Sequence, residues 1–178
     1  DRCKEGISSF YMNIYKEIVR CISEHDGLTV LEYAKTKGCG FTGVEIDGII
    51  FLGEAGMDFI HNVQSGRNVP AVGIDFYGPD NLMDYVVPDY FHETQRMIQR
   101  LMDAGHREIT FTKTPYESGK MLDCYMGYCN ALQINGIREC RTENKETDAR
   151  LLMERQTYSR SMERILARNS VELLMKRL

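Results

Sequence analysis

Apolar side chains recur at helical spacing near the start of the chain. Over residues 8–25 they return every three or four positions, a pattern that predicts an amphipathic helix with Ser8 or Ser9 as its N-cap. Shorter apolar runs then have the length of strands. The run over residues 46–52 is nearly continuous, as in a strand buried on both faces of a parallel sheet. We therefore expect strands at residues 28–33, 46–52, 69–76 and 83–87, and a short helix at 56–64.

The alternation of strands and helices continues after residue 87. Pro88 and Asp89 are expected to begin a helix that Gly105 ends, and residues 107–112 have the pattern of a strand. Strands that alternate with helices across short loops predict a doubly wound α/β fold with a parallel sheet and right-handed crossovers. Further helices are predicted at residues 117–135, 146–158 and 161–178.

Composition narrows the class of protein. With 178 residues, 43% of them hydrophobic and 27% charged, the chain can bury a core and is not expected to be intrinsically disordered. No run approaches the ~20 apolar residues needed to cross a bilayer, so no membrane partner is predicted. The six cysteines include no C-x-x-C pair, so their spacing indicates neither a zinc site nor a disulfide framework and favours reduced thiols in the cytoplasm.

Charge is unevenly distributed along the chain. Residues 1–137 hold 12 Lys and Arg against 19 Asp and Glu, and residues 138–178 hold 10 against 7, which together give the net charge of −4. An acidic body repels DNA phosphates, so this part of the chain should not bind nucleic acid by itself. In the basic tail the signs alternate, which favours a solvated helix face over a polybasic patch.

A series of segments resembles one known family. Their order and spacing resemble the effector-binding core of the lactose-repressor/galactose-repressor (LacI/GalR) transcriptional regulators, whose fold is similar to that of periplasmic sugar-binding proteins. This resemblance implies a periplasmic-binding-protein-like fold of type I, with a first lobe over residues 1–112 and part of a second lobe with a helical tail over residues 113–178. The matching segments are IDGIIFL at 46–52, VPAVGID at 69–75, VVPDY at 86–90, LMDAGHREI at 101–109 and GYCNALQINGI at 127–137.

The ends of two predicted strands carry candidate ligand contacts. In open α/β sheets ligands bind beyond the carboxyl ends of the strands, and Glu54 and Asp75 follow two of these ends. A carboxylate there can accept hydrogen bonds from adjacent hydroxyls, while Phe76 or Tyr77 can stack on the apolar face of a sugar ring. The alternative for Asp75 is a turn or helix-capping role.

The resemblance adds candidates outside these strand ends. By position it implies that Phe10 or Tyr11 forms a pocket wall, although core packing is the default for Phe10. Many family members have an arginine three residues before the equivalent of Gly127, and its planar fork grips sugar hydroxyls. This chain has Cys124 there, and Lys120, one turn earlier, would replace the arginine as a point charge. The usual sugar chemistry is therefore in question, and thiol sensing by Cys124 is a further alternative.

These observations together predict a ligand-sensing and dimerising domain of a bacterial LacI-type regulator. A small-molecule effector, a sugar or a derivative, would bind between the lobes and control operator DNA binding by a helix-turn-helix head that is not in this sequence. The alternative is a solute-binding protein of a sugar transporter. An enzyme is disfavoured because Gly38-Cys39-Gly40 lacks the context of a phosphate-binding loop and His106 has no nucleophile beside it. No catalytic residue, metal or cofactor is predicted.

One predicted helix indicates self-association. Its face of Met97, Ile98, Leu101 and Met102 has more apolar surface than a small monomer would bury. With the family resemblance, this face predicts a homodimer.

The order of elements also indicates further chain. No strand precedes the first helix at Ser8, and residues 138–178 offer helices where a second lobe needs strands. We therefore expect additional residues before Asp1 and among or after residues 138–178. A C-terminal interaction segment is the alternative for the basic tail.

Overall fold

The fold consists of two compact units. The computed structural model describes residues 9–31, 44–53, 57–64, 69–78, 82–111, 118–137 and 160–178. Contacts group residues 1–88 and 158–178 into unit 1, and residues 89–157 into unit 2. Unit 1 therefore joins the two ends of the chain.

This division differs from the lobe boundary expected at residue 112. Helix α3 (Tyr90–Asp103) falls in unit 2 because it packs along α4 (Gly119–Ile134). Helix α6 (Arg160–Met175) falls in unit 1 because it packs on α1 (Ser9–Ser23) and on the sheet. The solvated helix face expected in this region is present on α6, where Arg164, Arg168 and Glu172 are exposed. Its opposite, apolar face completes the core of the unit that begins the chain.

A three-stranded parallel sheet forms the centre of unit 1. It contains β1 (Ile49–Leu52), β2 (Ala71–Ile74) and β3 (Asp84–Val86) in that order, with Phe51 opposite Gly73 and Gly73 opposite Tyr85. The apolar runs predicted these strands because a strand covered on both faces needs few polar positions. The expected strands around residues 46–52, 69–76 and 83–87 are confirmed, each in a shorter form.

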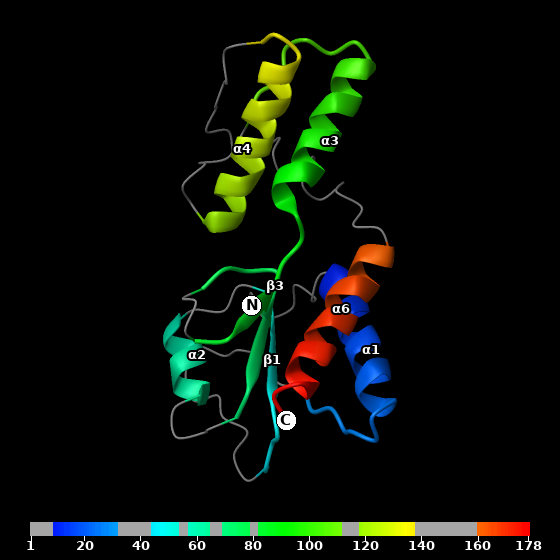
Figure 1. Ribbon diagram of the computed structural model, residues 1–178, viewed down its shortest axis with the longest axis vertical. Coiled ribbons are helices and arrows are strands. Elements are labelled where there is room, and N and C mark those ends of the chain that lie inside the picture. Colours follow the sequence, from blue (N-terminus) through cyan, green and yellow to red (C-terminus); the bar gives the residue numbers. More distant parts are fainter. Residues whose placement is uncertain are drawn as a thin grey trace, which may run out of the picture. The chain divides into compact units, whose positions relative to one another are not determined.

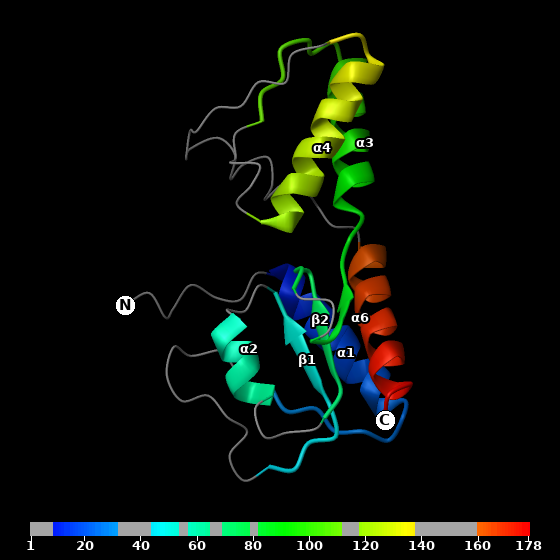
Figure 2. The ribbon, with the colours of Figure 1, turned by 60° about the vertical axis from the view of Figure 1, so that its left-hand side comes forward.

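Helices cover both faces of this sheet (Figures 1 and 2). α1 and α6 lie side by side on one face, and α2 (Met57–Gln64) lies on the other. Alternate strand residues point to the two faces. Val72 and Ile74 join the core beneath α1 and α6, whereas Phe51 and Ala71 pack with Ile60 of α2. A parallel sheet covered by helices on both faces confirms the predicted α/β class.

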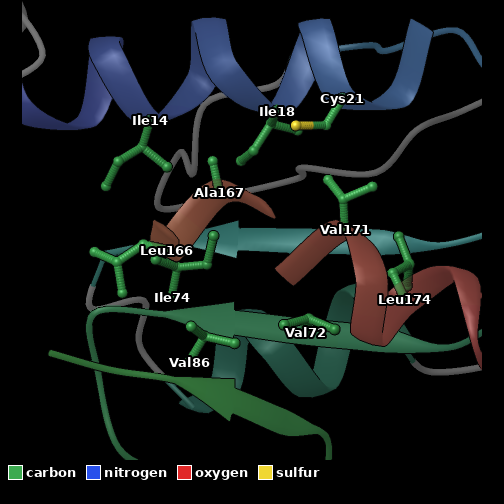
Figure 3. Packing of buried hydrophobic residues seen from close by; sticks show 10 residues of the cluster. All are labelled: Ile14, Ile18, Cys21, Val72, Ile74, Val86, Leu166, Ala167, Val171 and Leu174. Atoms are coloured by element: carbon green, nitrogen blue, oxygen red, sulfur yellow. The ribbon is translucent and has the colours of Figure 1, made fainter. Parts of the chain in front are cut away.

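The core beneath α1 and α6 is built from segments far apart in the sequence (Figure 3). Ile14, Ile18 and Cys21 of α1 meet Ala167 of α6, which is fully buried. Fully burying an isoleucine side chain such as that of Ile14 stabilises the fold by about 1.5–3 kcal/mol. The members of the cluster are Ile14, Ile18, Cys21, Val72, Ile74, Val86, Leu166, Ala167, Val171 and Leu174.

Polar contacts fix α6 at both ends. The buried Glu163 carboxylate accepts a hydrogen bond from Asn13 Nδ2 of α1 at 3.2 Å. Near the other end, Arg177 Nε lies 2.6 Å from Asp84 Oδ2 of β3. The buried carboxylate therefore has a partner, as a buried polar group requires.

Helix α3 begins where the sequence predicts. Asp89 is its N-cap and accepts a hydrogen bond from the His92 backbone N–H at 3.1 Å. His92 Nδ1 lies 2.7 Å from the second carboxylate oxygen. These contacts hold the pKa of Asp89 below its usual value, the backbone hydrogen bond having the largest effect.

The apolar face of α3 is covered within unit 2. Ile98 and Met102 are each 4% exposed and pack in one cluster with Tyr128, Ala131 and Leu132 of α4. The argument that this face is left for a second copy of the chain is therefore wrong, because α4 already occupies it.

Two expected strands are wrong over their described residues. Residues 28–31 form no strand, and the side chains of Leu28 and Val30 are 98% and 57% exposed. Residues 107–110 are also outside any strand, and of the described residues in the segment expected at 107–112 Phe111 alone forms an isolated β-bridge. Tyr128 Oη donates a hydrogen bond to the Ile109 carbonyl at 2.8 Å. The helix expected at 146–158 lies outside the described residues.

Candidate ligand site

The candidate site lies at the carboxyl edge of the sheet in unit 1. The parallel strands β1 and β2 end at the same edge and are followed by Gly53 and Asp75. Tyr11, in the first turn of α1, donates a hydrogen bond through its hydroxyl to Asp75 Oδ2 at 2.5 Å. A Cβ atom at Gly53 would lie 3.0 Å from Tyr11 Cζ. The start of α1 and the two strand ends therefore meet at this edge.

Asp75 occupies an unusual backbone conformation. Its φ is 70°, in the left-handed region that few residues other than glycine adopt, although aspartate tolerates it better than most. Its backbone N–H donates to the Val86 carbonyl at 3.0 Å, so β3 holds the peptide in place. Non-glycine residues in this region cluster at functional sites, which makes Asp75 the leading candidate here.

The Asp75 side chain is 3% exposed. Burying a carboxylate is costly unless hydrogen bonds replace the lost water. The Tyr11 hydroxyl supplies such a bond, and bonds to a charged acceptor are stronger than those between neutral groups. The sequence predicted the strand-end position of Asp75. The sequence around Asp75 did not indicate the hydrogen bond to Tyr11, because the two residues lie 64 positions apart.

Among the aromatic candidates, Phe76 is placed differently from expectation. It is 4% exposed and packs in the cluster on the α2 face, with its ring edge-on to Tyr85 at 5.4 Å between centroids. Packed in this cluster, Phe76 has the contacts of a core residue, and we do not assign it the stacking role expected from the sequence. Tyr77, the alternative, is 45% exposed.

Phe10 and Tyr11 divide the two expected roles between them. Phe10 is half-buried against the core beneath α1 and α6, and its ring is edge-on to Tyr11 at 5.2 Å between centroids. Tyr11 reaches the strand ends through its hydroxyl. Of the two, Tyr11 is therefore the residue that the structure brings to Asp75.

The remaining candidates lie in unit 2 or outside the described residues. Glu54 lies outside the described residues. Lys120 and Cys124 belong to unit 2, where Lys120 Nζ stands 4.8 Å from the centroid of the Tyr90 ring. Cys124 is 2% exposed, so its thiol is shielded from solvent oxidants. The candidate site consists of unit 1 residues.

A close helix contact in unit 2 was not predicted from the sequence. A Cβ atom at Gly127 would lie 2.2 Å from the Phe91 carbonyl oxygen, so α4 approaches the backbone of α3 at this point. The signal available in the sequence was a glycine inside a helical pattern, where it costs stability and often marks close packing.

Neither a metal-binding cluster nor a membrane-spanning helix is found among the described residues. No cluster of three or more His, Cys, Asp or Glu side chains among them is arranged to hold a metal ion. Among the same residues, no helix is both long and apolar enough to span a bilayer.

Comparisons with known structures show a shared fold. The chain superposes on the transcriptional regulator CelR in its cellobiose complex with a TM-score of 0.66 and 16% identity, over 94% of this chain and 72% of that one. The transcription regulator CcpA of Lactococcus lactis gives 0.62 and 17%, over 94% and 71%. A LacI family transcriptional regulator from Enterococcus faecium with bound ribose gives 0.59 and 17%, over 92% and 68%. At these identities the likeness establishes a periplasmic-binding-protein-like fold alone.

Comparisons of sequence establish the family. A search of curated proteins finds no significant match. The family model described as periplasmic binding proteins and the sugar-binding domain of the LacI family matches residues 5–157. Since this match spans most of the chain, the protein belongs to the family of periplasmic binding proteins and LacI-family sugar-binding domains.

Proposed function

We propose that the chain is the effector-binding domain of a LacI-type transcriptional regulator and that its effector is a sugar or a similar polyol. The observation that carries this proposal is Asp75. It is a buried carboxylate in a left-handed turn at a parallel strand end, hydrogen-bonded to Tyr11. Ligands of open α/β sheets bind at such ends, and the family match is to a sugar-binding domain.

The chemistry of the edge favours a neutral ligand with hydroxyl groups. The carboxylate of Asp75 accepts hydrogen bonds, which ligand hydroxyls donate. The exposed ring of Tyr77, two residues along, offers an apolar face. Phe10, Tyr11, Gly53 and residues 75–78, the described residues at this edge, include no Lys or Arg. A phosphate or carboxylate ligand would therefore meet the negative charge of Asp75 without a cation among these residues.

The regulator is favoured over the solute-binding protein of a transporter by the structural neighbours. The three named above are all transcriptional regulators, and two were determined with cellobiose or ribose. We assign operator binding to a separate helix-turn-helix segment, because residues 1–137 are acidic and repel phosphates. The effector would act by its different affinity for two conformations of the domain, and no catalytic step is proposed.

We also propose that the domain forms a homodimer, but not through the apolar face of α3 that the sequence suggested. Because α4 covers Ile98 and Met102, a homodimer has to use another face. Sedimentation velocity over a range of protein concentrations tests the assembly, and a concentration-independent monomer would contradict this part.

Thermal unfolding in the presence of sugars tests the binding function. A ligand that binds only the folded state raises its stability by about 2.7 kcal/mol at a concentration of 100 Kd. D-ribose and cellobiose, with a panel of other neutral mono- and disaccharides, should include at least one sugar that raises the Tm. If no sugar in the panel raises it, the proposed function is wrong.

A further inference from the structure

The hydroxyl of Tyr11 connects α1 to the candidate ligand carboxylate. Tyr11 Oη donates to Asp75 Oδ2 at 2.5 Å, and a phenylalanine would fill the same volume without this bond. We propose that Tyr11 is a positioning residue that orients the Asp75 carboxylate for the ligand. This inference rests on the proposed function, because it takes Asp75 to be a ligand contact.

The backbone around Asp75 explains why its side chain needs such a partner. The left-handed turn, with φ of 70°, directs Asp75 out of the regular alternation of the strand. The side chain is nevertheless 3% exposed, so water cannot orient it. A donor from the protein has to fix the carboxylate plane, and Tyr11 provides one.

Gly53 makes room for the tyrosine hydroxyl. A Cβ atom at this position would lie 3.1 Å from Tyr11 Oη and 3.0 Å from Tyr11 Cζ, which is tighter than ordinary contact. Its own N–H donates to the Ile74 carbonyl at 3.0 Å, which ties the end of β1 to β2. A side chain at position 53 would therefore crowd the Tyr11 hydroxyl and disturb its hydrogen bond to Asp75.

The bond has the character of an orienting contact. Short O–H···O⁻ bonds of this length are charge-assisted and directional. The Tyr11 hydroxyl occupies an acceptor position on Oδ2, and the direction of this bond sets the orientation of the carboxylate that a ligand hydroxyl would meet. The hydroxyl of Tyr11 should therefore matter more for ligand affinity than for folding.

The binding test compares Tyr11→Phe with Tyr15→Phe, which removes a hydroxyl from the same helix four residues further on. Isothermal titration uses D-ribose and cellobiose, and thermal unfolding is followed in parallel. Tyr11→Phe should weaken the binding of whichever sugar binds the wild type by about tenfold, the factor that ~1.4 kcal/mol represents. Its Tm should stay within a few degrees of that of Tyr15→Phe. If Tyr11→Phe binds the sugar as tightly as the wild type does, the inference is wrong. This holds also if its Tm falls by many degrees, because the hydroxyl then serves folding and not binding.

A second measurement needs no ligand and separates this inference from the proposed function. Asp75→Gly removes the carboxylate and suits the left-handed backbone. The Tm losses of Tyr11→Phe and Asp75→Gly should combine to less than their sum in the double variant, because both remove the same bond. Additive losses would overturn the positioning role. If no sugar of the panel binds the wild type, the proposed function is wrong, and the double variant alone decides whether Tyr11 holds Asp75.

Discussion

At the scale of single residues, Asp75 shows how side chain and backbone combine in one position. Alanine would remove the carboxylate and would also face the left-handed backbone, which costs roughly 1–2 kcal/mol for a residue with a Cβ atom. Asparagine tolerates this conformation and keeps the shape of aspartate while removing the charge. Asp75→Asn is therefore the sharper test of the ligand role, and Asp26→Asn is its matched control, because Asp26 is exposed and also has a positive φ, 57°.

Gly127 provides the second residue-scale prediction. Gly127→Ala places a methyl group against the Phe91 carbonyl, and a backbone group cannot rotate away as a side chain can. Overpacking of this kind costs about 1–3 kcal/mol, so chemical denaturation should show a loss in this range. Gln133→Ala, on the exposed face of the same helix, should change stability by a few tenths of a kcal/mol. Equal stabilities for the two variants would show that α3 and α4 are further apart than described.

The candidate site was partly predictable from the sequence. Asp75 could be found because strand ends in α/β sheets are the usual place for ligands. The role of Phe76 could not, because the chain turns at Asp75 and returns the next ring to the core on the α2 face. The contact with Tyr11 joins segments that are distant in sequence, and composition or periodicity carries no information about it.

At the scale of elements, the start of α3 depends on Asp89. Its carboxylate caps the helix through the His92 N–H and lies beside the His92 ring. Because the folded-state pKa of Asp89 is lowered, its contribution to stability is present above the ordinary aspartate pKa and is lost as the pH falls through the folded-state value. The cap therefore matters most at neutral pH.

We predict that Asp89→Ala lowers the free energy of unfolding by about 1 kcal/mol near neutral pH, the usual cost of losing a cap. The cost should shrink as the pH falls below about 3.9, the ordinary aspartate value. Asp89→Asn keeps a capping oxygen but does not titrate, so its stability relative to Asp89→Ala should not vary with pH. Urea denaturation across this pH range checks both. A cost that is constant with pH for Asp89→Ala would mean that the charge of Asp89 does not contribute.

The strands that are covered on both faces could be predicted from the sequence. The runs that became β1 and β2 were apolar because the strands are covered on both faces. Residues 28–31 have strand-forming side chains, but a strand also needs a paired neighbour. The described sheet has the order β1-β2-β3 and does not include these residues. Propensity alone therefore predicted a strand that pairing does not support.

At the scale of the whole molecule, unit 1 is closed by the last helix of the chain. Ala167, Val171 and Leu174 of α6 pack against α1 and the sheet, although the sequence separates them from α1 by well over a hundred residues. The alternating charges on α6 indicated one solvated face, but the sequence did not indicate which surface the opposite face packs on. Its apolar stripe needs a partner, and residue spacing does not say which.

Leu174→Ala tests this closure. Leu174 is 5% exposed, and truncating a buried leucine costs about 2–5 kcal/mol. Hydrogen exchange should show lost protection in α1 and β2 as well as in α6, since all three share one core. Ile165→Ala, on the same helix at 57% exposure, should leave exchange in α1 and β2 unchanged. Changes confined to residues 160–178 in Leu174→Ala would show that α6 is not part of the unit 1 core.

The central claim is that Asp75 contacts a neutral sugar-like effector. Isothermal titration of the wild type, Asp75→Asn and Asp26→Asn, with the sugar that raises the Tm most, tests it directly. A hydrogen bond to a charged group contributes about 1.5–3 kcal/mol, so Asp75→Asn should bind at least about tenfold more weakly. Asp26→Asn should bind as the wild type does. Equal affinities for the wild type and Asp75→Asn would show that the carboxylate at this strand end does not contact the ligand.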